Sequence, residues 1–143
     1  MSDPYNLQRF IDAQDGVFDT ALAELRAGDK QSHWMWFIFP QLAGLGRSST
    51  AEFYGIASLD EARAYLQHPV LGNRLDKCVC AILPWAGCLR PEQFFGPIDS
   101  LKLRSSLTLF DQVEPNSLFA EALTAFYGSE RDERTIALLE PQQ

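Results

Sequence analysis

The sequence predicts an all-α fold, a compact single-domain helical bundle of about six to eight helices with a buried aromatic segment, over residues 1–143. Apolar residues recur mostly at helical spacing, and alternating strand patterns are absent. The length is that of one domain that can bury a core without disulfides or metal. The composition, 46% hydrophobic and 22% charged, indicates a folded globular chain rather than a disordered one.

The N-terminal region predicts two helices separated by Gly16. The first should follow Asp3 and Pro4, and the second should cover about residues 17–27. Gly28 then fits a C-terminal stop, because glycine readily adopts the left-handed backbone that ends many helices. The inward-facing residues are expected to be Leu7, Phe10, Ile11, Phe18, Leu22 and Leu25.

Two capping-box patterns predict the next helices. Ser49 is followed three residues later by Glu52, which would start a short helix through Tyr54. Ser58 and Glu61 repeat the pattern and open a helix that ends near Pro69. Its inward residues are expected to be Leu59, Ala62, Tyr65 and Leu66.

Four helical segments are predicted in the second half. Residues 71–83 carry the clearest amphipathic stripe, Leu71, Leu75, Cys78, Val79, Ile82 and Leu83, and Pro84 closes it. After a turn-rich stretch, residues 98–110 predict a mostly buried helix, because Ile98, Leu101, Leu103, Leu107, Leu109 and Phe110 wrap more than one face. Residues 116–127 form a further amphipathic helix that stops at Gly128, and Asp132 can cap a last short helix.

Charge and composition exclude several classes of function. The net charge of −7 argues against a general nucleic-acid binder, which needs a basic face. No segment has the pattern of a signal peptide or the length of a membrane span, so we expect a cytoplasmic protein without membrane contact. The three cysteines fit reduced thiols, and no metal site or cofactor is expected.

The segment from Gly28 to Tyr54 is the candidate functional region. Residues 34–40 are apolar on every side, so they must be buried in the core or form the wall of a pocket. The following loop contains Gly44, Gly46, Arg47, Ser48 and Ser49, which resembles an anion-binding nest. A simple turn followed by a helix cap explains the same residues.

Other polar residues near apolar ones are candidates for chemistry. Ser32 and His33 precede Trp34 and Trp36, which could stack on a base or sugar or belong to the core. Lys102 lies among apolar residues and must pair with Asp99, extend to solvent, or face a polar cavity together with Ser105. Asp132 and Thr135 are most simply capping residues, and their charged neighbours Glu130, Arg131, Glu133 and Arg134 form a solvated face.

Several motifs resemble one known family. They are Gly28-Asp-Lys30, the string SHWMWFIFPQ from Ser32 to Gln41, Gly44-Leu-Gly46, Tyr54-Gly-Ile56, His68-Pro69, Phe95-Gly96, Ile98-Asp99, Leu101-Lys102, Ser105-Ser106, and Asp132 with Thr135. With them the chain resembles domain-of-unknown-function family eighteen-ten over nearly its whole length. The resemblance implies a compact α-helical domain of uncharacterised function.

A distant similarity connects the order of these features to the YbiA-like family, which is associated with ADP-ribose and with hydrolysis of N-glycosidic bonds. That family's motif carries a Glu where this chain has Ser32 and His33. The similarity therefore implies a ligand class more directly than a reaction.

The leading hypothesis is that the chain binds a small phosphorylated ligand of nucleotide or ADP-ribose type, with N-glycosidic bond hydrolysis as a further step. The candidate catalytic residues are His33, Asp99 and Lys102. The candidate ligand-binding residues are Lys30, Ser32, Trp34, Trp36, Gln41, Gly44, Gly46, Arg47, Ser48, Ser49, Tyr54 and Ser105. The alternative is a non-enzymatic protein-interaction module whose aromatic block is core or a docking surface.

Overall fold

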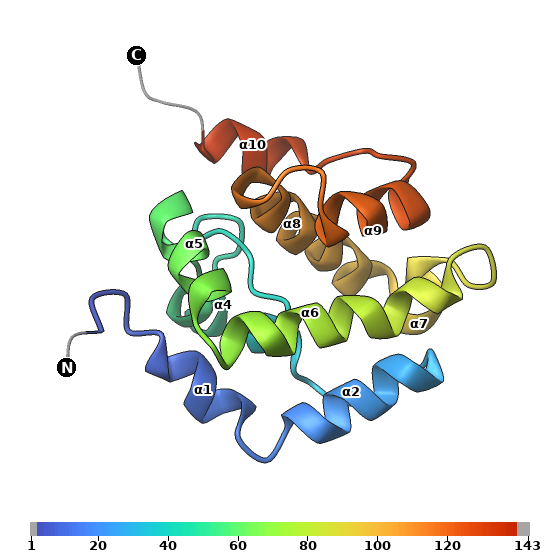
Figure 1. Ribbon diagram of the computed structural model, residues 1–143, viewed down its shortest axis with the longest axis horizontal. Coiled ribbons are helices and arrows are strands. Elements are labelled where there is room, and N and C mark those ends of the chain that lie inside the picture. Colours follow the sequence, from blue (N-terminus) through green and yellow to red (C-terminus); the bar gives the residue numbers. More distant parts are fainter. Residues whose placement is uncertain (1–2, 140–143) are drawn as a thin grey trace.

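The computed structural model describes residues 3–139, which form ten α-helices, one 3₁₀ turn and no β-strand (Figure 1). The helices are α1 (Gln8–Gln14), α2 (Phe18–Ala27), α3 (Met35–Ile38), α4 (Ser49–Tyr54), α5 (Leu59–Gln67), α6 (Leu71–Ile82), α7 (Pro91–Phe95), α8 (Pro97–Val113), α9 (Leu118–Tyr127) and α10 (Glu133–Leu139), with the 3₁₀ turn η1 at Leu83–Trp85. The all-α prediction is confirmed. The helices outnumber the six to eight expected because of two short ones, α3 and α7, of which α3 lies inside the aromatic block.

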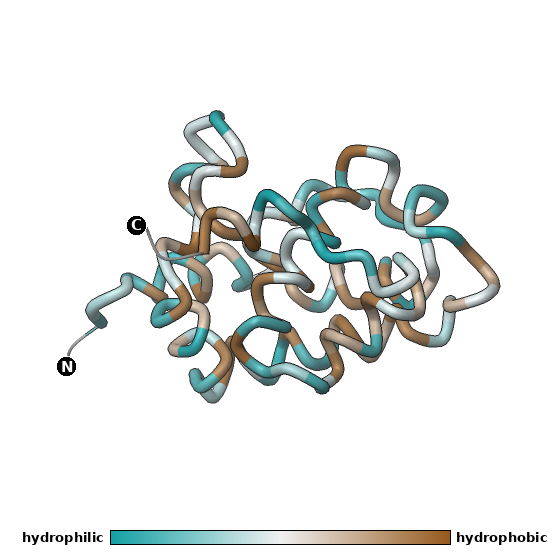
Figure 2. Tube along the Cα trace, turned by 90° about the horizontal axis from the view of Figure 1, so that it is seen from above, coloured by the Kyte–Doolittle hydropathy of each residue, from teal (hydrophilic) through white to brown (hydrophobic). Residues whose placement is uncertain are grey.

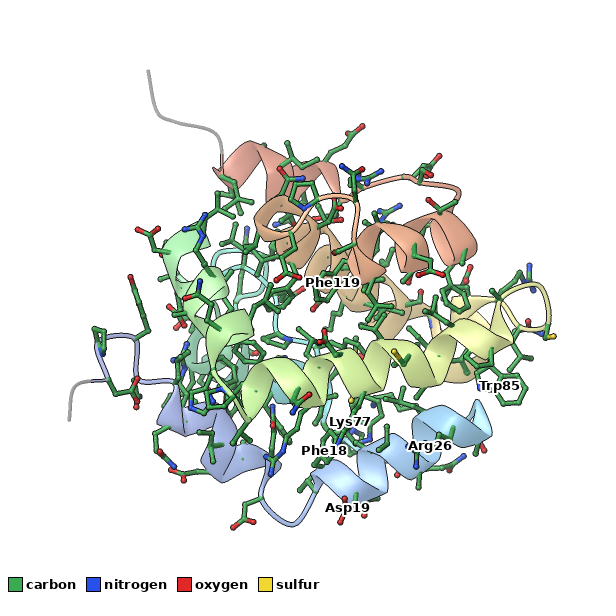
Figure 3. The ribbon with its side chains drawn as sticks, in the orientation of Figure 1. Phe18, Asp19, Arg26, Lys77, Trp85 and Phe119 are labelled. Carbon is green, nitrogen blue, oxygen red and sulfur yellow. The ribbon has the colours of Figure 1, made fainter. Side chains whose placement is uncertain are left out.

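Two helices organise the bundle. α6 lies between α2 and α9, and α8 contacts α5, α7, α9 and α10 (Figure 1). Hydrophobic and hydrophilic positions alternate along single helices, as expected for helices that bury one face (Figure 2). Phe119 shows the result, because it lies in the core and its ring packs 5.6 Å from that of Phe110 (Figure 3).

The helix ends largely follow the predicted caps. Gly28 and Gly128 adopt the left-handed backbone, with φ of 68° and 59°. The hydroxyl of Ser58 accepts the N–H of Glu61 at 3.2 Å. Asp132 accepts the N–H of Thr135 at 3.0 Å, which confirms its capping role.

Gly28 is also required by packing. The indole N–H of Trp85 donates to the carbonyl of Leu25 at 3.1 Å, which places the ring over the C-terminal end of α2 (Figure 3). A Cβ atom at Gly28 would lie 2.9 Å from that ring. This helix end therefore needs glycine for two reasons, its left-handed backbone and its close contact with Trp85.

Two predictions about helix ends and burial are wrong. The cap of α4 is Ser48 and not Ser49, because the backbone is extended at Ser48 and its hydroxyl accepts the N–H of Ala51 at 3.1 Å. Ile98 and Leu101 are 70% and 58% exposed rather than buried, because the first turns of α8 have no helix packed over that face. The later apolar residues of α8, Leu103, Leu107, Leu109 and Phe110, are buried as expected.

Between residues 3 and 139, no helix combines the length and the apolar character that a bilayer crossing requires.

The contact between α5 and α6 generates a prediction about stability. A Cβ atom at Gly72 would overlap the carbonyl oxygen of Leu66 and lie 2.9 Å from its carbonyl carbon. Because both are backbone atoms, Gly72→Ala should force the helices apart and cost about 3 kcal/mol of unfolding free energy. Urea unfolding would measure this, and the neighbouring exposed Asn73→Ala should leave stability nearly unchanged. Equal stability of the two variants would contradict the close contact.

Candidate functional site

The loop between α3 and α4 is held by main-chain hydrogen bonds. Ala43 donates its N–H to Ile56 at 2.7 Å, and Ile56 donates to Gln41 at 2.9 Å. Gly44 has φ of 97°, and a Cβ at Gly46 would lie only 2.7 Å from the Cβ of Ala51. The two glycines thus let the loop turn tightly against the first turn of α4.

The first half of α8 faces this loop. Ile98, Leu101, Lys102 and Ser105 have i, i+3, i+4 and i+7 spacing, so they lie on one side of the helix. All four line a pocket between the loop, the start of α4, α8 and the N-terminal end of α10. Its volume is about 510 Å³.

The pocket is rich in positive charge. Arg47, Lys102, Arg104 and Arg134 line it, while Asp132 is the one carboxylate in the described lining. Arg47 is exposed and takes part in none of the hydrogen bonds or ion pairs found between residues 3 and 139. Its charge is therefore available to a ligand.

Arg104, on α8, lies near two carboxylates. Its terminal nitrogens lie 4.0 Å from Asp132 and 3.8 Å from Glu130. Its Nε is buried and has no hydrogen-bond partner within the described part of the chain. Asp132 is occupied mainly by α10, because its Oδ2 accepts both the N–H and, at 2.6 Å, the hydroxyl of Thr135. One carboxylate in the described lining thus faces four cationic side chains, so the lining carries more positive than negative charge.

One carboxylate beside the pocket bridges two lysines. Asp99 lies 2.9 Å from the ammonium of Lys30 and 3.7 Å from that of Lys102. Lys30 also lies 4.8 Å from the ring centre of Trp34, and Lys102 lies 4.3 Å from that of Trp36. Of the three alternatives for Lys102, two hold, because it pairs with Asp99 and also lines the pocket. Lys30 is the closer partner of Asp99.

Glu24 holds residues 31–34, at the start of the aromatic segment, by hydrogen bonds. Its carboxylate accepts the N–H groups of Gln31 and Ser32 at 2.8 and 2.9 Å, the hydroxyl of Ser32 at 2.6 Å and the indole N–H of Trp34 at 3.0 Å. Burial raises the pKa of Glu24, but the hydrogen bonds from Ser32, Gln31 and Trp34 outweigh burial and lower the pKa to about 2. The ionised carboxylate thus holds residues 31–34 in place.

The structure brings about half of the proposed site residues together. Those that line the pocket are Trp36, Gln41, Gly46, Arg47, Ser48, Lys102 and Ser105. Asp99 is one contact away through Lys102, and Lys30 is one contact further through Asp99. Trp34 is fully buried, so it belongs to the core and offers no face for stacking. His33, Gly44, Ser49 and Tyr54 lie outside the lining, and Ser32 is bound to Glu24.

The lining residues that were not predicted as site residues include two exposed apolar residues and two arginines. Ile98 and Leu101 were assigned to the core, although their spacing with Lys102 and Ser105 could have placed them on one face. Arg134 was assigned to a solvated face, and Arg104 was not considered. Nothing local could have identified the two arginines, because they line the same pocket only when α10 packs on α8.

Comparisons with known proteins identify relatives without a known function. The profile of the family described as "Protein of unknown function (DUF1810)" matches residues 4–139. The chain is similar to the crystal structure of the conserved hypothetical protein Rv1873 from Mycobacterium tuberculosis, with 49% identity and a TM-score of 0.94. That match covers 98% of this chain and 100% of the other. A search of curated proteins found no match.

The Glu24 cluster predicts a specific pH dependence of stability. The unfolded carboxyl takes up a proton near its ordinary pKa of 4.5, whereas the folded one holds its charge down to about 2. The stability that the ionised group contributes is therefore complete above about pH 4.5 and is lost as the pH falls toward 2.

Replacing Glu24→Gln should cost about 2 kcal/mol at neutral pH, because charge-assisted hydrogen bonds become neutral ones. Denaturant unfolding from pH 7 to 2 should show that the difference in unfolding free energy between wild type and Glu24→Gln shrinks as the pH falls from about 4.5 toward 2. The exposed Glu121→Gln should follow wild type throughout. If the loss of stability in Glu24→Gln did not change with pH, the charge of Glu24 would not be its cause.

Proposed function

The chain belongs to the DUF1810 family, whose function is unknown, and from its pocket we propose that it binds a small phosphorylated ligand of nucleotide or ADP-ribose type. The phosphate would be held by Arg47, Arg104 and Arg134, with Ser48 and the backbone near Gly46 adding hydrogen-bond donors. Lys102 would contact the ligand from the wall of α8.

One observation carries the proposal. Four cationic side chains and a single carboxylate line one pocket in a chain whose net charge is −7. Lys102 and Arg104 have carboxylates within 4.0 Å, whereas Arg47 and Arg134 make no ion pair in the described chain. A bound anion would balance the positive charge that remains. Arginine guanidinium groups match phosphate oxygens in geometry as well as charge.

The size of the pocket supports a small molecule. Its volume of about 510 Å³ falls within the range of about 300–1,000 Å³ that is typical of ligand sites. Trp36 supplies an aromatic wall, although Lys102 already lies over one face of its ring. A non-enzymatic protein-docking surface is the alternative, and the charged, concave lining favours a ligand over it.

A single observation bears on hydrolysis of an N-glycosidic bond. In such a reaction a water oxygen bonds to the anomeric carbon and the carbon–nitrogen bond breaks. A purine or pyrimidine base takes up a proton as it leaves, whereas nicotinamide leaves NAD as a neutral base and the proton of the water goes to solvent. A carboxylate near the anomeric carbon would assist by holding the water or the developing positive charge. Asp132 is the carboxylate in the described lining, so it is the residue to test first, ahead of the paired Asp99 and the exposed His33.

The binding proposal predicts ligand-dependent stabilisation. At about a hundred times its dissociation constant, ADP-ribose, NAD or a nucleoside monophosphate should add about 2.7 kcal/mol and raise Tm by several degrees. Arg47→Ala should weaken binding about tenfold or more without changing the stability of the free protein, because Arg47 makes no ion pair in the described chain. Lys102→Ala should also weaken binding.

Lys77→Ala is the matched control, since this exposed lysine lies on α6 outside the pocket (Figure 3). Thermal unfolding and calorimetric titration would measure both effects. Wild-type binding in both Arg47→Ala and Lys102→Ala would refute the proposal.

For hydrolysis, Asp132→Asn should slow release of the base by about a hundredfold or more while α10 stays capped, because the amide oxygen still accepts from Thr135. Release of nicotinamide from NAD, followed by chromatography, is a suitable assay. The exposed Asp19→Asn on α2 should keep the wild-type rate (Figure 3). Absence of turnover in the wild type would limit the function to binding.

A further inference from the structure

Ile98 and Leu101 are the most exposed large hydrophobic residues in the described chain, at 70% and 58%. They lie three residues apart on α8, on the same stripe as Lys102 and Ser105. Both line the cationic pocket. Scattered exposed hydrophobic residues are ordinary, but two on one stripe at the edge of a charged pocket form an apolar subsite.

A ligand that consisted of phosphate alone would leave this subsite in water. The arginines of the pocket match an anionic group, whereas Ile98 and Leu101 match an apolar one. Covering two aliphatic side chains is favourable in proportion to the apolar area removed from water. The lining therefore suits a molecule with an anionic part and an apolar part.

The side chain of Gln41 indicates which kind of apolar group the ligand carries. Its side-chain amide lines the pocket and makes none of the hydrogen bonds found between residues 3 and 139. An amide offers both a donor and an acceptor, which an alkyl chain cannot use but the edge of a nucleobase can. Trp36 has one ring face covered by Lys102, so Ile98 and Leu101 offer the freer apolar surface.

We infer that Ile98 and Leu101 form the base-binding subsite of this pocket, with Gln41 contacting the edge of the base. The ligand is then a nucleoside phosphate whose phosphate lies among Arg47, Arg104 and Arg134. This inference rests on the proposed function and adds the part of the ligand that sets its specificity.

The test compares ribose 5-phosphate with AMP, which share the sugar and the phosphate and differ by the base. By isothermal titration calorimetry, AMP should bind at least tenfold more tightly. The double variant Ile98→Ser with Leu101→Ser should remove that advantage and leave the affinity for ribose 5-phosphate unchanged. Because both residues are exposed, its Tm should stay close to that of the wild type.

Two further variants sharpen the result. Val70→Ser changes an exposed apolar residue outside this lining and should keep the full preference for AMP. The single Leu101→Ser variant should lose part of the preference, and it serves in place of the double variant if that one unfolds.

The outcomes separate this inference from the proposed function. Equal affinities for AMP and ribose 5-phosphate in the wild type would overturn the base subsite and leave phosphate binding standing. A preference for AMP that survives the double variant would also overturn it. Binding of neither compound, nor of ADP-ribose, would overturn the proposed function itself.

Sedimentation of the wild type gives one more outcome. Self-association that the double variant abolishes would show that a second copy of the chain covers Ile98 and Leu101, and would overturn the inference.

Discussion

The carboxylate of Glu24 is the constraint on which the candidate site depends. It accepts four hydrogen bonds from residues 31–34, a segment that has no helix or strand of its own to satisfy its N–H groups. Trp34 is fully buried, and a buried indole N–H without a partner is costly, so this segment needs an acceptor in a fixed position. Because Glu24 projects from α2, it fixes the aromatic segment against the helical frame.

The effect extends from Glu24 to the pocket through packing. Trp34 is held in the core by its indole N–H, and two residues later Trp36 emerges at the pocket wall. Lys30, just before the clamped segment, donates to the carbonyl of Ser32 at 2.6 Å and pairs with Asp99. Asp99 in turn contacts Lys102, so the first turns of α8 are positioned by the same loop. The pocket is thus built on structural polar contacts that a ligand need not touch.

Local patterns in the sequence predicted much of the fold but less of the site. The stripe of α6 and the glycine stops depend on residues close together in the sequence, and they appear where expected. Ile98 and Leu101 were misjudged, because a hydrophobic residue shows by itself no sign of whether another helix will cover it. Glu24 was also missed as an acceptor, since its donors lie in a loop whose path follows from tertiary packing. Arg104 and Arg134 line the same pocket because α10 packs on α8, and the local sequence carries no pattern that predicts this packing.

The position of α10 has a kinetic consequence. This seven-residue helix carries Arg134 and follows Asp132, so two charged groups of the pocket depend on a short segment docked on α8. A short helix can open locally with less free energy than unfolding of the whole domain requires. Undocking of α10 would remove one wall of the pocket while the bundle of α2, α6 and α8 stays folded. The residence time of the proposed anionic ligand would then be tied to this opening, and slow amide exchange in α10 would report how long the ligand stays.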